Sequence, residues 1–252
     1  MIYSFRWVLL LVYLSSGTAL SKSDTAPAAT KQIWDSWYTV TVKKKIKYAY
    51  YNDHFEQKGP KIYFQNKFWK SEENYINEEQ LGAYAKDDDN LSPDFFNFRS
   101  TYRTTETIID GTVLNGNTLH VRTKKNGKEI PMVKKTMGKQ VFFSGFFPLW
   151  LGKRLTLMKP GKPLTFTTIL EDTVEEGFPN ESGWVRLEAP DDFAKKSNTT
   201  KLTVFHRGAN SLWYVEKNGN PVRIDMTSRG TLVERVSQKE AENFLKNPSS
   251  GE

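Results

Sequence analysis

Three Asn-Gly dipeptides constrain the fold of this chain more than any other feature. They lie at Asn115-Gly116, Asn126-Gly127 and Asn218-Gly219. Asn and Gly tolerate the positive φ values that tight hairpin turns require, so each dipeptide predicts a pair of neighbouring antiparallel strands. The second dipeptide would join residues 119–125 to 128–133, and the third would join 212–217 to 221–226. This spacing predicts an antiparallel β structure.

Alternation of apolar and polar residues predicts further strands. From Tyr38 to Tyr50 the apolar side chains share one parity and the threonines and lysines share the other, with Lys44 as the exception. This period of two is typical of a half-buried strand, and a bulge or strand end is expected near Lys44. Other strands are expected over residues 61–69, 95–109, 164–170, 184–189 and 201–207.

The polar stretch over residues 71–93 interrupts this pattern. It is expected to form a short helix over Glu78–Tyr84 or an irregular surface excursion. The run Asp87-Asp88-Asp89 lacks the residue order of a calcium-binding loop and is interpreted as a solvated acidic loop.

Two short helices are predicted beside the strands. Apolar residues between 142 and 151 recur at three- and four-residue spacing, although Gly145 and Pro148 weaken a helix there. Ser237 and Glu240 form a capping-box pair that begins a helix over residues 238–246. The expected fold is therefore all-β: a curved antiparallel sheet, half-barrel or clam-like, with one short apolar helix and a short C-terminal helix.

The first nineteen residues are typical of a cleavable secretory signal peptide. Arg6 precedes an apolar run over residues 7–14, and Gly17 and Ala19 supply the small residues of a cleavage site. The apolar run is much shorter than the ~20 residues that a membrane-spanning helix needs. The organisation expected is a signal peptide (1–19), a flexible leader (20–32), a single β-rich domain (33–247) and a disordered tail (248–252). The expected location is periplasmic or secreted, with no transmembrane segment in the mature chain.

Composition narrows the function classes. The chain has no cysteine, which excludes disulfides, thiolate metal sites and a cysteine nucleophile. Its net charge of +7 favours anionic partners such as an envelope polymer, but the same charge also serves solubility. Motifs of nucleic-acid-binding domains are absent, so nucleic acid is not an expected partner. The oligomeric state does not follow from the sequence.

Catalytic and metal-binding motifs are likewise missing. His54, His120 and His206 lie far apart, without metal-ligand spacing, and no serine-nucleophile elbow occurs. The Glu171-Asp172 pair ends an apolar strand, where a functional group could face a cleft, but sequence neighbours on a strand point to opposite faces. We therefore assign no catalytic residue, no metal ligand and no cofactor.

The apolar segment near residue 146 is the strongest candidate for a ligand contact. A helix in this position either fills the core or covers an apolar groove, and core filling is the commoner role of such a segment. The candidate ligand-binding residues are Phe142, Phe143, Phe146, Phe147 and Trp150.

The half of the chain after Tyr102 resembles uncharacterised bacterial periplasmic domains built as a curved antiparallel half-barrel. The resemblance rests on residues 106–111, residues 157–161 and the hairpin of residues 213–223. More distantly, the chain is similar to envelope proteins of the lipoprotein-carrier type. That resemblance implies an apolar cavity that holds acyl chains.

Three functions remain open at this point. The leading one is non-enzymatic binding of an amphipathic or lipid-like ligand between the sheet and residues 142–151. The second is an envelope hydrolase acting on a glycan or peptide, which needs two facing carboxylates or a histidine with a carboxylate. The third is a structural partner that docks to another envelope protein through an uncovered strand edge.

Overall fold

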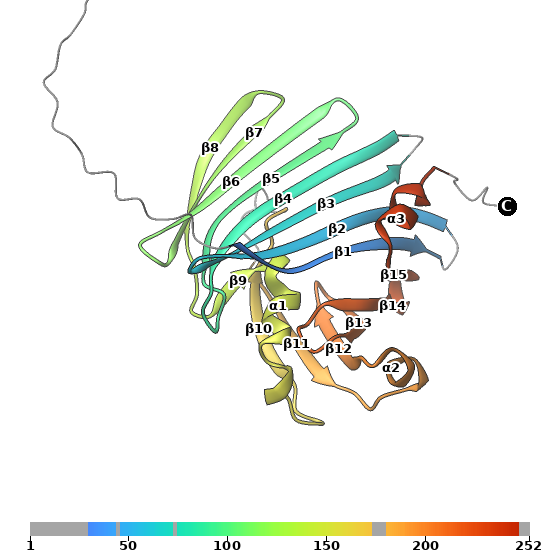
Figure 1. Ribbon diagram of the computed structural model, residues 1–252. Coiled ribbons are helices and arrows are strands. Elements are labelled where there is room, and N and C mark those ends of the chain that lie inside the picture. The colour runs from blue at the N-terminus through green and yellow to red at the C-terminus, as the bar shows by residue number, and fades with distance from the viewer. Residues whose placement is uncertain (1–29, 44–45, 73–74, 173–179, 247–252) are drawn as a thin grey trace, which may run out of the picture.

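The computed structural model describes residues 30–43, 46–72, 75–172 and 180–246. Within these residues, fifteen strands form one continuous sheet in the order β8-β7-β6-β5-β4-β3-β2-β1-β15-β14-β13-β12-β11-β10-β9. Neighbouring strands run antiparallel except β9, which lies parallel to β10. The sheet is strongly curved and does not close, because β8 and β9 are its two ends (Figure 1). The predicted all-β class with a curved antiparallel sheet is confirmed.

The strands differ in length along the chain. The first eight are long: β1 (Thr30–Val42), β2 (Ile46–Lys58), β3 (Lys61–Glu72), β4 (Tyr75–Lys86), β5 (Pro93–Tyr102), β6 (Thr105–Leu114), β7 (Thr118–Lys125) and β8 (Lys128–Thr136). The later ones have eight residues or fewer: β9 (Val141–Phe143), β10 (Leu164–Ile169), β11 (Asn180–Leu187), β12 (Thr200–His206), β13 (Ala209–Val215), β14 (Pro221–Met226) and β15 (Thr231–Val236). The helical pieces are η1 (Ser144–Phe146), α1 (Phe147–Gly152), η2 (Leu155–Leu157), α2 (Asp192–Ser197), η4 (Thr227–Arg229) and α3 (Gln238–Phe244).

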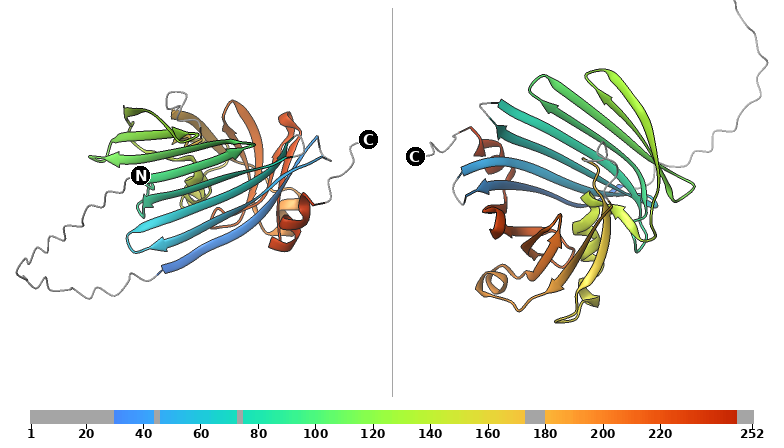
Figure 2. Two further views of the ribbon diagram at one scale, coloured as in Figure 1. Left: turned by 90° about the horizontal axis from the view of Figure 1, so that it is seen from above. Right: turned by 180° about the vertical axis from the view of Figure 1, so that it is seen from behind.

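The sheet bends so that its two halves face each other. We call β1–β8 the long wall and β10–β15 the short wall; α1 lies in the angle between them (Figures 1 and 2). The main core joins both walls, since the Phe146 ring lies 5.8 Å from Phe64 on β3 and the Phe142 ring lies 6.3 Å from Phe166 on β10. Residues 141–152, the inter-wall segment, therefore hold the two halves of the sheet together through aromatic packing.

The Asn-Gly prediction is confirmed at all three sites, since each dipeptide lies between two paired antiparallel strands. Asn115-Gly116 and Asn126-Gly127 connect β6 to β7 and β7 to β8, and all four residues have positive φ. Two positive φ values in succession define the hairpin turn that matches strand twist. The third dipeptide also lies between two paired strands, but in a wider loop where Glu216 donates its N–H to Asn220.

The strand end expected near Lys44 is confirmed: residues 38–50 form the end of β1 and the start of β2 rather than one continuous strand, and the backbone turns at Lys43, which has a φ of 49°. A second local prediction is wrong. The short helix expected over Glu78–Tyr84 is part of β4, which pairs with β3 on one side and β5 on the other. Hydrogen bonding to two neighbouring strands outweighs the helix propensity of this stretch.

The helix expected over residues 142–151 is shorter than predicted. Val141–Phe143 pair with β10, Ser144–Phe146 form a 3₁₀ turn, and α1 begins only at Phe147. Pro148 stands in the first turn of α1, where its missing N–H is not needed. The C-terminal prediction is confirmed, because the Ser237–Glu240 capping box is present at the start of α3.

The ends of the predicted domain are partly outside the described residues. The signal peptide and the tail after residue 247 fall there. β1 begins at Thr30, so the last three residues of the expected leader belong to a strand. The short helix α2 was not predicted; its N-cap is Asp191, whose carboxylate accepts the Ala194 N–H.

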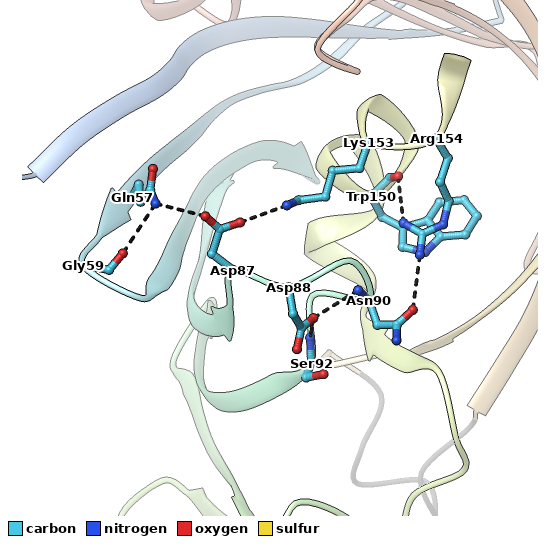
Figure 3. A network of polar contacts seen from close by, with 9 residues as sticks. All are labelled: Gln57, Gly59, Asp87, Asp88, Asn90, Ser92, Trp150, Lys153 and Arg154. Atoms are coloured by element: carbon cyan, nitrogen blue, oxygen red, sulfur yellow. Dashed lines mark hydrogen bonds and ion pairs between the residues drawn. The ribbon is translucent and has the colours of Figure 1, made fainter. Parts of the chain in front are cut away.

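The acidic loop at residues 87–89 ties α1 to the long wall (Figure 3). Asp87 accepts hydrogen bonds from Lys153 Nζ at 2.9 Å and from Gln57 Nε2 at 2.9 Å. Arg154 reaches the same loop, with Nη2 donating to Asn90 Oδ1 at 3.3 Å. Asp87 was expected to lie in a solvated acidic loop. In the structure its carboxylate also holds the residue that follows α1 against the long wall.

Candidate functional site

A cleft of about 410 Å³ opens between the two walls beside α1. Its surface is mainly apolar, with contributions from both walls and the inter-wall segment: Tyr51, Phe64, Phe68, Leu81, Phe98, Phe147, Pro148, Val204, Trp213, Ile224 and Met226. On the long wall, these side chains reach the cleft because side chains alternate between the two faces of a strand. Every second residue of β2, β3, β4 and β5 therefore faces the short wall. The registers Asp53↔Asn66, Asn66↔Leu81 and Leu81↔Phe98 place them in one row across the long wall.

One acidic side chain interrupts this apolar face. Asp53 occupies an inward position on β2 and is 9% exposed. Asn66, its partner across β3, donates to the carboxylate at 2.7 Å. Burial nevertheless raises the pKa of Asp53 from 3.8 to about 7, since one amide donor does not replace the lost hydration. Burial therefore favours the protonated form of this carboxyl.

A second buried carboxylate, Glu171, enters the cleft from the segment after β10. It is 1% exposed and accepts hydrogen bonds from the backbone N–H of Ser144 (3.2 Å), the Ser144 hydroxyl (2.6 Å) and the backbone N–H of Gly145 (3.2 Å). Burial raises the pKa of Glu171 from 4.5 to about 7, although these hydrogen bonds oppose the rise. The contacts identify Glu171 as the group that fixes the first residues of η1.

His206 is the histidine of the cleft. Its Nε2 lies 3.0 Å from Thr168 Oγ1, and its ring lies 5.3 Å from Phe166 and 6.3 Å from Phe147. Burial lowers the pKa of His206 to about 4, so the imidazole is neutral at physiological pH. It therefore adds a neutral polar group to an aromatic wall.

Charged side chains surround the rim. Arg207 Nη2 lies 2.7 Å from Asp172 Oδ1, and Arg229 Nη2 donates to the Arg207 carbonyl at 3.0 Å. All three residues line the cleft. An apolar interior with two buried carboxyls and a charged rim suits a ligand that has both an apolar body and a polar group.

The five predicted ligand-binding residues differ in whether they reach the cleft. Phe142, Phe143 and Phe146 are fully buried and Trp150 is 5% exposed, all four within the main core. Phe147 belongs to the same core and is 4% exposed, but it is the one of the five that also lines the cleft, beside Ser144, Gly145 and Pro148. Of the five, Phe147 alone remains a candidate for ligand contact.

Asp53 was not selected from the sequence, although a signal was present. It stands between Tyr51 and Phe55 on the apolar parity of a strand, where an acid is unusual. His54, its neighbour, points to the other face and lies 3.6 Å from Asp35. The sequence argued against the Glu171-Asp172 pair because neighbours on a strand point to opposite faces, but both residues follow the end of β10 at Ile169 and both line the cleft.

Metal ligation and membrane crossing by a helix have no support in the described residues. No cluster of three or more His, Asp or Glu side chains placed to hold a metal ion occurs among residues 30–43, 46–72, 75–172 and 180–246. None of the helices in these ranges has the length and apolar character to cross a membrane.

Comparison with known proteins identifies no family. No protein-family model matches the chain, and no curated protein matches it. Two solved structures are similar: a DUF1089 family protein from Pseudomonas aeruginosa (TM-score 0.41, 11% identity, 84% of this chain and 95% of that one) and a beta-barrel-like protein of the domain of unknown function DUF1849 from Brucella abortus (TM-score 0.43, 13% identity, 84% and 98%). These scores are too low to transfer any activity to this chain.

Proposed function

We propose that the chain is a non-enzymatic binding protein whose cleft holds a small amphipathic ligand. The observation that carries this proposal is the apolar cleft itself, about 410 Å³ in volume and lined by aromatic side chains from both walls. Sites for small molecules typically occupy about 300–1,000 Å³, with few polar groups among apolar ones. The apolar body of the ligand would contact Phe68, Trp213 and Phe147.

The polar end of the ligand is proposed to meet Asp53 or the charged rim. Asp53, with a pKa of about 7, can present a protonated carboxyl, which donates a hydrogen bond as well as accepting one. Arg207 and Arg229 at the rim supply cationic donors for an anionic headgroup. This combination favours a lipid-like molecule over a wholly apolar one.

Hydrolysis is the second candidate, favoured by the two buried carboxyls in one cleft. Glycosidases use such a pair as acid and base or nucleophile. Here, however, both oxygens of Glu171 accept hydrogen bonds from Ser144 and Gly145, which commits that carboxylate to holding η1. A hydrolase would then depend on Asp53 alone, so binding is the better-supported function.

Dansyl-labelled undecanoic acid tests the binding proposal, because its fluorescence rises in an apolar site. We expect saturable binding by the wild-type protein and displacement by oleate. Ala209→Trp places a large ring in the cleft and should weaken binding at least ~10-fold, a loss of about 1.4 kcal/mol. Asn210→Trp is the matched control: the next residue on β13 is exposed on the opposite face and should leave affinity within about twofold.

Thermal melting of both variants separates lost binding from lost folding. Absence of saturable binding by the wild-type protein, or equal affinity in Ala209→Trp, would overturn the proposal. Turnover of nitrophenyl glycosides or of a quenched-fluorescence peptide library, abolished by Asp53→Asn, would instead establish the hydrolase.

A further inference from the structure

Nearly all of the excess positive charge of the chain lies in one hairpin. Residues 118–139, which span β7, β8 and the following turn, are called the basic hairpin. They contain seven cations and one acid: Arg122, Lys124, Lys125, Lys128, Lys134, Lys135 and Lys139, against Glu129. Their net charge is +6, while the whole chain carries +7, so the other 230 residues together contribute +1. The surplus is therefore a local feature rather than a general aid to solubility.

The basic hairpin also exposes apolar side chains. β8 is an end strand of the sheet, and Ile130, Met132 and Val133 on it are 41%, 46% and 42% exposed. Three of the nine exposed large apolar side chains of the described residues thus lie on this one strand. Ile130 and Val133 pair with Thr123 and Val121 of β7, whereas Met132 lies beside His120 and Arg122 on the other face, so the end strand exposes apolar side chains on both of its faces.

The carboxylates of the adjacent strand β6 are bonded to residues of β5, although Asp110 also lies opposite Arg122 of the hairpin. On β6, the Glu106 carboxylate is bonded to Arg99, and Asp110 accepts a hydrogen bond from Asn97 at 2.6 Å. Lys124, Lys125, Lys128 and Lys134 are all exposed. The hairpin therefore presents a positive field to an outside partner.

We propose that the basic hairpin docks the protein onto an anionic phospholipid bilayer. Lysines near such a surface gain electrostatic energy, and their long side chains let apolar neighbours enter the headgroup region. A soluble polyanion would use the lysines but would gain nothing from Ile130, Met132 and Val133. A second copy paired through β8 would bring lysines against lysines, and Pro131 offers no N–H to an added strand.

Edge protection is the competing role for the same lysines. Charged side chains on an end strand prevent edge-to-edge aggregation without any partner. The two roles predict different behaviour. If the lysines only protect the edge, the wild-type protein should not bind membranes, and a variant without these charges should aggregate.

Vesicle flotation of the full chain distinguishes them. We expect binding to phosphatidylcholine vesicles with about 30% phosphatidylglycerol, little binding to pure phosphatidylcholine, and release when salt rises from ~0.1 M to ~0.5 M, where screening is strong. Replacing Lys124, Lys125, Lys128 and Lys134 by Gln should reduce partitioning by several hundredfold, at about fivefold for each lysine. As a control, replacing the exposed lysines Lys195, Lys196, Lys217 and Lys239 by Gln removes the same amount of charge outside the basic hairpin. This replacement should change the partitioning onto vesicles by less than ~10-fold.

A fluorescent label tests whether the apolar residues enter the lipid. Because the chain has no cysteine, Met132→Cys can be labelled alone with a polarity-sensitive dye. The label at residue 132 should shift to the blue on anionic vesicles, whereas the same label at Lys217→Cys should not.

Three outcomes would overturn the proposal. One is no vesicle binding by the wild-type protein. Another is equal binding by the two four-lysine variants. The third is retention on heparin without binding to anionic vesicles, which would make the partner a soluble polyanion.

Discussion

Burial of Glu171 predicts a protein that loses stability as the pH rises. The pKa of this carboxyl is about 7 in the folded chain and near its ordinary 4.5 in the unfolded chain. A raised pKa favours the protonated form in the folded state, so its stabilising effect is fully present below about pH 4.5 and is lost as the pH rises through about 7. At 1.36 kcal/mol for each pH unit, the difference amounts to about 3 kcal/mol.

Glu171→Gln removes the ionisation and keeps the side-chain length, but its amide nitrogen would face the backbone N–H of Ser144 or Gly145, which costs about 1–3 kcal/mol at every pH. The free energy of unfolding of the variant should lie ~1–3 kcal/mol below that of wild type near pH 4, and the variant should gain ~3 kcal/mol relative to wild type between pH 4 and pH 8. Urea denaturation followed by tryptophan fluorescence across this range measures both values. Asp172→Asn is the control, since that carboxylate is 41% exposed in an ion pair with Arg207 and should change stability by less than ~1 kcal/mol. Equal pH dependence of Glu171→Gln and wild type would refute the reasoning.

Asp53→Asn should act in the same direction, because burial raises the pKa of Asp53 from 3.8 to about 7; the same urea series should show ~4 kcal/mol of added stability near pH 8, and no gain there would contradict it. Gly145→Ala should destabilise the protein by ~1–3 kcal/mol, because the new methyl would overlap the Phe64 ring, and thermal melting measures the loss. Gly138→Ala is its control: the nearest atom would be Val141 Cγ2 at 3.4 Å, so the melting temperature should be almost unchanged.

The parts of the fold that could be predicted from sequence are those set by local backbone chemistry. Positive φ at Asn126 and Gly127 is a local requirement, so the β7–β8 hairpin follows from two residues. The capping box of Ser237 and Glu240 is local in the same sense. β4 is different, because its Glu, Gln, Leu and Ala residues have good helix propensity and only the pairing with β3 and β5 makes them a strand.

The site is harder to predict because its members are distant in sequence. Asp53, Ser144 and Glu171 come from three segments that only the folded sheet brings to one cleft. Aromatic residues at helical spacing in the inter-wall segment suggested a ligand contact, but spacing does not distinguish a side chain facing the core from one facing a cleft. Phe146 and Phe147 are sequence neighbours, and yet only Phe147 reaches the cleft.

The contacts of α1 with both walls determine whether the cleft can open when a ligand binds. At its C-terminal end, Gly152 packs so closely on the β13–β14 loop that a Cβ would overlap the Asn218 carbonyl, which fixes α1 to the short wall. The next residue, Lys153, binds Asp87 on the long wall (Figure 3). Because one short helix is held by both walls at adjacent residues, moving the walls apart would break these contacts together with the aromatic core around Phe146. A ligand is therefore expected to enter a preformed cleft through its rim, and affinity should depend on the lining side chains rather than on closure of the sheet.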